Sequence, residues 1–161
     1  GNTGQSLVKK LTTFNCCIII YDKYKSGFGN QKIEECNMNR IFSDADIVSL
    51  HIPLNQTTKY LINQDFINKM EKSFYILNTS RGGIVSNQGL VWGLKNGKVL
   101  GAGLDVLENE NKQFNKIMRD QYLEYLLQDS NVIITPHIAG ISKESQKKIS
   151  ETIIRKITKL I

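Results

Sequence analysis

FYILNTSR, residues 74–81, is an apolar run of strand length that ends in a polar turn. Similar runs lie on either side of it, at 47–51 and 99–104, and further out at 16–21 and 131–134. Helix-like segments alternate with these runs, and this alternation predicts βαβ units on a parallel sheet. Most of the runs are apolar without strict alternation, as expected when helices cover both faces of the sheet. The chain is therefore predicted to be an α/β protein with a Rossmann-type, doubly wound parallel sheet.

The helices are predicted from apolar residues at helical spacing. They are expected near residues 3–14, 38–43, 63–70, 86–95, 122–127 and 142–161. In the first, Leu7, Leu11 and Phe14 should face inward, and Asn96-Gly97 should end the fourth. The last places Ile149, Ile153, Ile157 and Leu160 on one face, which needs a surface to pack against.

Polar side chains able to do chemistry follow three of the predicted strands. Arg81 follows the run at 74–79, Asp105 with Glu110 follows the run at 99–104, and His137 follows the run at 131–134. In a parallel sheet these strand ends lie along one edge, where open α/β sheets bind their ligands. We therefore expect an arginine, two carboxylates and a histidine to converge on one crevice.

Composition and charge limit the class of protein. The chain has 161 residues, 40% of them hydrophobic, and a formal net charge of +6. Residues 142–161 contain six Lys or Arg and two Glu, so one helix carries four of these charges. A basic helix face is usually only solvated, and no nucleic-acid reading motif accompanies it. No apolar run is long enough to cross a bilayer, so we expect a cytoplasmic protein with neither nucleic acid nor membrane as a partner.

The chain opens with Gly1-Asn2-Thr3-Gly4, runs into a helix, and reaches Asp22 after the next strand. A strand, a glycine-rich turn, a helix and an acidic residue about 20 positions on make the dinucleotide fingerprint. Here the first strand and the first glycine are absent. An ordinary turn glycine with a helix N-cap is the alternative, and Asp22 favours the fingerprint.

Four blocks in this order resemble the NAD-binding domain of the D-isomer-specific 2-hydroxyacid dehydrogenases, the family of phosphoglycerate dehydrogenase and hydroxypyruvate reductase. They are DADIVSLHIPL at 44–54, LNTSRGGIV at 77–85, GAGLDV at 101–106 and TPHIAG at 135–140. The resemblance implies hydride transfer between NAD and C2 of a small D-2-hydroxy acid or 2-oxo acid, with 3-phosphoglycerate among the candidates. It also implies a homodimer.

The resemblance implies that Arg81, Glu110 and His137 are the catalytic residues. His137 would exchange the proton of the substrate hydroxyl, Glu110 would favour its imidazolium form, and Arg81 would grip the substrate carboxylate. The family usually has proline after the glutamate, whereas this chain has Asn111 and a long connection over 108–130. Asp105 resembles the carboxylate beside the nicotinamide carboxamide. The residues expected to contact the cofactor are Gly1, Asn2, Thr3, Gly4, Asp22, Ile52, Pro53, Thr79, Ser80, Arg81, Asp105, His137, Ala139 and Gly140.

NAD is expected rather than NADP, because the carboxylate of Asp22 repels a 2′-phosphate, although Lys23 and Lys25 lie close in sequence. No metal site is expected. Residues 1–141 should form the cofactor domain, and residues 142–161 a helix that leads back to an absent substrate domain.

Three expectations depend on the missing first strand and the missing substrate domain. Strand edges should be left unpaired. The isolated chain should be poorly stable or prone to aggregate. It should also have negligible turnover. The alternative function is a non-catalytic NAD-sensing or partner-binding module on the same fold, since fold alone does not fix function.

Overall fold

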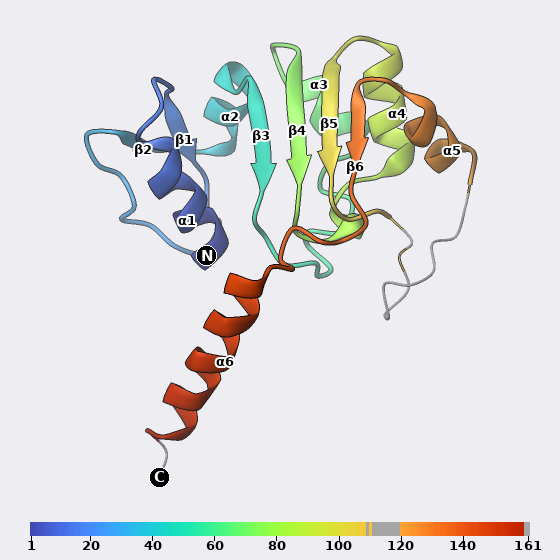
Figure 1. Ribbon diagram of the computed structural model, residues 1–161. Helices are drawn as coiled ribbons and strands as arrows, with labels where there is room; N and C mark the ends of the chain where they lie inside the picture. Colours follow the sequence, from blue (N-terminus) through green and yellow to red (C-terminus); the bar gives the residue numbers. More distant parts are fainter. Residues whose placement is uncertain (109, 111–119, 160–161) are drawn as a thin grey trace.

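The computed structural model describes residues 1–108, 110 and 120–159, and Figure 1 shows the order of its elements. All its named strands run parallel to their neighbours. The elements are α1 (Asn2–Leu11), β1 (Ile18–Ile20), β2 (Ile33–Glu35), α2 (Met38–Asp44), β3 (Ile47–Leu50), α3 (Gln64–Lys69), β4 (Phe74–Asn78), the 3-10 helix η1 (Gly82–Ile84), α4 (Asn87–Lys95), β5 (Val99–Leu104), α5 (Gln121–Gln128), β6 (Val132–Ile134) and α6 (Lys143–Ile157). The predicted α/β class is confirmed.

The strands form two separate sheets. One has the order β3-β4-β5-β6, and the other pairs β1 with β2. In the larger sheet Leu50, Asn78, Leu104 and Ile134 are register partners from strand to strand, so the four carboxyl ends are level. No pairing joins β1 to β3 in the described part of the chain, so the expectation of unpaired strand edges is confirmed.

The core lies between the larger sheet and α3, α4 and α5, which pack against one another and the strands. Phe74 and Ile76 of β4, Ile67 of α3 and Leu90 of α4 are fully buried there. Side chains on the opposite face of the sheet remain exposed, including Ile47, Tyr75, Leu77 and Ile133. The expectation that helices cover both faces is therefore wrong for this sheet, because β4 alternates between buried and exposed residues.

Helices α2 to α5 begin and end close to the predicted positions. Asn63 and Ser86 cap the first turns of α3 and α4 with their side chains, and Gly97 follows α4 with φ of +65°. A left-handed residue just past the last turn is a usual helix stop, and glycine adopts it without strain. The predicted helix within 108–130 is present as α5.

The first fifty residues differ most from expectation. The strand predicted at 16–21 is only Ile18–Ile20, and β2, with the sequence Ile33-Glu34-Glu35, was not expected. The first helix ends at Leu11 rather than at residue 14. Phe14 lies beyond that end and is 66% exposed, so its predicted inward placement is wrong.

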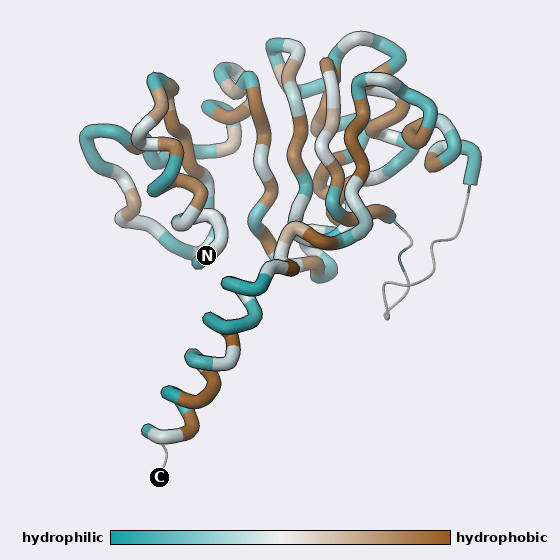
Figure 2. The backbone as a smooth tube through the Cα atoms, in the orientation of Figure 1, coloured by the Kyte–Doolittle hydropathy of each residue, from teal (hydrophilic) through white to brown (hydrophobic). Residues whose placement is uncertain are grey.

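α6 projects away from the rest of the molecule (Figure 1). Figure 2 shows apolar residues along one side of it, and Ile149, Ile153 and Ile157 are exposed, as an unpartnered apolar stripe would be. Leu160, predicted to share that face, lies outside the described residues.

Candidate active site

The strands of the larger sheet end at one edge, towards which their arrowheads point in Figure 1. Ile52 and Pro53 follow β3, Thr79 follows β4, Asp105 follows β5, and Thr135 begins the turn after β6. The sequence predicted this convergence from the parallel order alone.

Asp105 holds the loop that carries His137. Its Oδ1 accepts hydrogen bonds from the Thr135 hydroxyl at 2.6 Å and the Ile138 amide at 2.9 Å, and its Oδ2 accepts one from the Ala139 amide at 3.0 Å. Burial raises the pKa of Asp105, but these three hydrogen bonds and the nearby His137 outweigh it, so the pKa lies below its ordinary value. The ionised carboxylate therefore fixes the loop from both of its oxygens.

His137 itself adopts a left-handed conformation with φ of +57°. Backbone strain of this kind costs about 1–3 kcal/mol and persists only where the surroundings enforce it. The hydrogen bonds that the amides of Ile138 and Ala139 donate to Asp105 supply that constraint. The strain marks His137 as a residue whose position is imposed by the fold.

Glu110 and His137 form a pair across two loops. Nδ1 of His137 lies 2.9 Å from Oε2 of Glu110, and the two side chains are 26% and 10% exposed. A carboxylate only accepts hydrogen bonds, so Nδ1 carries the proton in this pair. Oε1 of Glu110 accepts from the amide of Leu107 at 2.7 Å, which orients the carboxylate towards the imidazole. This arrangement fixes the imidazole tautomer and the orientation of the ring.

Arg81 is presented by a turn that Asn78 organises. Asn78 is fully buried, its amide Nδ2 donates to the backbone oxygen of Arg81, and its Oδ1 accepts from the amide of Ser80. The hydroxyl of Ser80 donates to the backbone oxygen of Leu50. Nη1 of Arg81 donates to the backbone oxygen of Ser80, and the side chain is exposed at the same edge of the sheet.

The turn with Arg81 lies directly against the turn with Glu110. Gly82 is buried, and a Cβ placed on it would lie 1.8 Å from the backbone oxygen of Leu107. Only glycine permits so close an approach of two backbones. The two loops therefore pack backbone against backbone at this point.

The residues predicted at the start of the chain lie at the amino end of α1. Gly1 is the N-cap, and no side chain caps this helix, while Asn2 and Thr3 are exposed. A Cβ on Gly4 would lie 3.4 Å from Cβ of His51, so α1 begins against the end of β3. A helix amino terminus with uncapped N–H groups is suited to the pyrophosphate of a dinucleotide.

Asp22 stands just after β1. Its Oδ1 accepts from the amides of Tyr24 at 2.9 Å and Lys25 at 3.1 Å. The hydrogen bond from Tyr24 is the largest cause that lowers its pKa, and it outweighs the raising effect of burial. The carboxylate is therefore ionised near neutral pH, as a ribose-binding acid must be. These features, with the uncapped helix start, fit NAD.

Sequence reasoning missed several residues that build the site. Asn78 and Thr135 hold its turns, while Tyr60 and Glu108 connect its loops. A polar residue at the end of an apolar strand was a usable signal for Asn78. Gly140 contributes its backbone oxygen to Ser145 near the start of α6.

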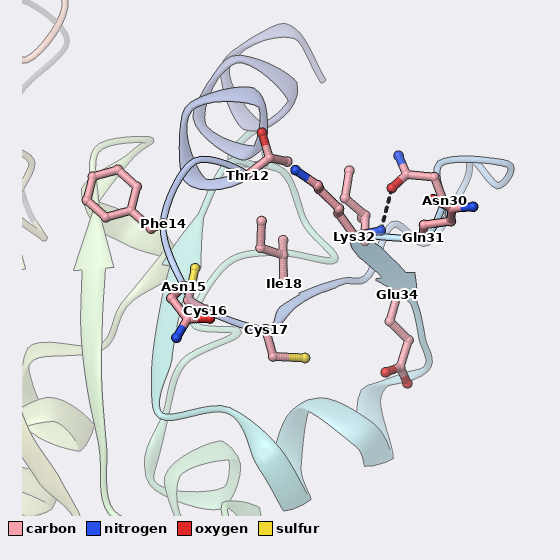
Figure 3. A pocket seen from close by; sticks show the side chains of 11 residues that line it. Thr12, Phe14, Asn15, Cys16, Cys17, Ile18, Asn30, Gln31, Lys32 and Glu34 are labelled. Carbon is pink, nitrogen blue, oxygen red and sulfur yellow. Dashed lines mark hydrogen bonds between the residues drawn. The ribbon is translucent and has the colours of Figure 1, made fainter.

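A hollow of about 570 Å³ lies elsewhere, at the amino ends of β1 and β2 (Figure 3). Cys16, Cys17 and Lys32 are among the residues that line it, and none of the predicted site residues does. The candidate active site is therefore placed at the carboxyl ends of the strands of the larger sheet, where Glu110 pairs with His137 and the backbone of His137 is strained.

Residues 1–108, 110 and 120–159 contain neither a metal-binding cluster nor a membrane-spanning helix. No three His, Cys, Asp or Glu side chains gather in a way that could hold a metal ion. No helix has both the length and the apolar character to cross a membrane.

Fold and site together define an α/β domain that binds a dinucleotide. Residues 1–139 match the family described as "D-isomer specific 2-hydroxyacid dehydrogenase, NAD binding domain". The chain belongs to this family, and its cofactor is NAD.

Named relatives and solved structures agree with the family. The hydroxypyruvate reductase of Thermotoga maritima is 35% identical over 99% of the chain and 50% of its own length. The D-lactate dehydrogenase of Escherichia coli is 30% identical over 99% of the chain and 50% of its own length. The NAD-complexed form of the D-isomer specific 2-hydroxyacid dehydrogenase from Lactobacillus delbrueckii ssp. bulgaricus superposes with a TM-score of 0.84 at 29% identity, over 99% of the chain and 50% of that structure. The chain thus spans about half the length of the relatives it matches.

Proposed function

We propose that this domain serves an oxidoreductase that transfers a hydride between NAD and C2 of a small D-2-hydroxy acid or 2-oxo acid. The observation that carries the proposal is the pair of His137 and Glu110, 2.9 Å apart, with His137 in a loop that Asp105 holds at the carboxyl edge of the sheet. A module that only sensed NAD would have no use for an acid/base pair beside Arg81. NAD, when bound, accepts the hydride from C2 or returns it.

His137 would exchange the proton of the substrate oxygen through Nε2, because Nδ1 is engaged with Glu110. Glu110 would keep the ring oriented through its bond to Nδ1, so that Nε2 can face the substrate oxygen. Arg81 would hold the substrate carboxylate with two parallel hydrogen bonds, which its planar guanidinium can form. The three residues then bind the acid, orient it and move one proton.

The remaining predicted contacts are assigned to NAD. Gly1 to Gly4 would face the pyrophosphate, and Asp22 would bind the ribose hydroxyls. Ile52, Pro53, Thr79, Ser80, Ala139 and Gly140 would line the cofactor along the strand ends. Asp105 was expected beside the nicotinamide carboxamide; its bonds to Thr135, Ile138 and Ala139 support a role in holding the His137 loop.

The substrate is expected to be a 2-oxo acid with a small side chain. Two of the relatives are a hydroxypyruvate reductase and a D-lactate dehydrogenase, which supports this class. The full-length protein should oxidise NADH with at least one of hydroxypyruvate, glyoxylate and pyruvate, and the reverse reaction should be tried with 3-phosphoglycerate. Absorbance at the NADH band measures the rate. If none of these acids is turned over, the proposed function fails.

Four expectations stay predictions. They are homodimeric assembly, a cytoplasmic location, the domain boundary at residue 141 and the negligible turnover of residues 1–161 alone. The exposed sheet face with Ile47, Tyr75, Leu77 and Ile133 supports an interface of some kind, since parallel sheets are usually covered on both faces.

A further inference from the structure

Glu108 connects the turn that carries Glu110 to the start of α4. Its Oε2 accepts a hydrogen bond from the amide of Asn87 at 2.6 Å, in the first turn of that helix. Glu108 is half-buried, and the helix dipole favours a negative charge at this place. The side chain therefore ties residue 108, two positions before Glu110, to a helix of the core.

Tyr60 connects the same carboxylate to a third loop. Its hydroxyl lies near the Glu108 carboxylate, and hydrogen bonding to that carboxylate is the largest cause that raises the pKa of Tyr60. Its backbone amide donates to the backbone oxygen of Gly83 at 2.9 Å, next to the Arg81 turn. Tyr60 is also left-handed, with φ of +52°, a conformation that bulky residues adopt only under constraint.

These bonds join the loop that carries Arg81 to the loop that carries Glu110. Gly82 packs on the backbone of Leu107, and the amide of Leu107 donates to Oε1 of Glu110. The backbone amide of Tyr60 is bonded to Gly83, two residues after Arg81. The carboxylate of Glu108, two residues before Glu110, is bonded to the amide of Asn87. If either were released, the backbone at Leu107 could shift, and the carboxylate of Glu110 would then leave Nδ1 of His137.

We propose that Tyr60 and Glu108 are positioning residues, which hold the Glu110 carboxylate on His137 at a fixed place beside the Arg81 turn. The proposal rests on the proposed function for its kinetic consequence, but its structural consequence can be measured without turnover. The competing possibility is that Glu108 only stabilises the start of α4, in which case the pair of Glu110 and His137 would be unaffected by its loss.

The variants are Tyr60→Phe, which removes only the hydroxyl, Glu108→Gln, which keeps the shape and removes the charge, and the double variant. Tyr125→Phe is the matched control, because its hydroxyl is hydrogen-bonded to Asp129 at the end of α5, away from the site. The full-length protein, labelled with ¹⁵N-histidine, is examined by NMR for solvent exchange of the Nδ1 proton of His137, assigned by its absence in His137→Ala. NADH oxidation with a 2-oxo acid gives kcat and KM.

Each single variant is expected to speed exchange of that proton about tenfold and to lower kcat about tenfold, with the KM for NADH unchanged, since small displacements of a catalytic group have effects of this size or larger. The double variant should be no worse than the more severe single one, because both residues serve one connection. Tyr125→Phe should match the wild type. Exchange within twofold of the wild type in both single variants would overturn the proposal, even if thermal stability fell. Faster exchange in a protein that turns over no 2-oxo acid would uphold the positioning role and refute the proposed function instead.

Discussion

Replacing His137 with alanine in the full-length protein is expected to lower kcat for reduction of a 2-oxo acid by roughly 10²–10⁴-fold, the usual contribution of a positioned acid or base. Nδ1 of His137 is held by Glu110, so proton exchange with the substrate is assigned to Nε2. Binding of NADH should change little, because the proposed cofactor contacts lie along all the strand ends. Stopped-flow absorbance gives the rate, and fluorescence titration gives the Kd for NADH.

Two further variants separate loss of the imidazole from damage to its loop. His137→Asn should be equally inactive, and asparagine tolerates the left-handed backbone found here. Ile138→Ala should keep its activity, because Ile138 is partly exposed and gives Asp105 only its backbone amide. Turnover by His137→Asn at the wild-type rate would remove the histidine from the mechanism.

Asp105→Asn is expected to destabilise the His137 loop by about 1–3 kcal/mol, because it leaves the Ala139 amide without an acceptor at this position. Asp105 is 4% exposed and accepts hydrogen bonds on both oxygens, whereas an asparagine can accept on only one of them. Amide hydrogen exchange at Ile138 and Ala139 measures the loss. The control is Asp46→Asn, since Asp46 is highly exposed and its ion pair with Lys72, at 3.5 Å, should contribute little.

The effect of Asp105→Asn should depend on pH in a defined direction. The folded protein holds the pKa of Asp105 below its ordinary value of 3.8, so the carboxylate contributes stability above that pH. The contribution is lost as the pH falls through the lowered folded value. The difference between wild type and variant should therefore be largest near pH 7 and shrink below about pH 3.8. A difference that grew on acidification would contradict this role.

The edge where the site lies was predictable because it follows from strand direction alone. The parallel order places Arg81, Asp105 and His137 at one edge of the sheet, independently of the contacts that their side chains make. The pairing of Glu110 with His137 needed the resemblance, since a carboxylate five residues after Asp105 is not placed by periodicity.

Contacts made by backbone atoms were not predictable in the same way. The role of Gly82 depends on the backbone of Leu107, which is 25 residues away in sequence, and nothing local signals that approach. Tyr60 and Glu108 meet because three loops fold together. β2 was not predicted for the same reason. Glu34 and Glu35 give no apolar pattern, and the segment is a strand because it pairs with β1.

The most direct test of the central claim follows the hydride itself. The full-length protein is given NADH that carries deuterium at the transferable C4 position, together with whichever 2-oxo acid it reduces fastest, and the product is examined by NMR and chiral chromatography. One deuterium at C2 of a D-2-hydroxy acid, for each NADH consumed, is the predicted result. A product without deuterium at C2, or of the L configuration, would contradict the account.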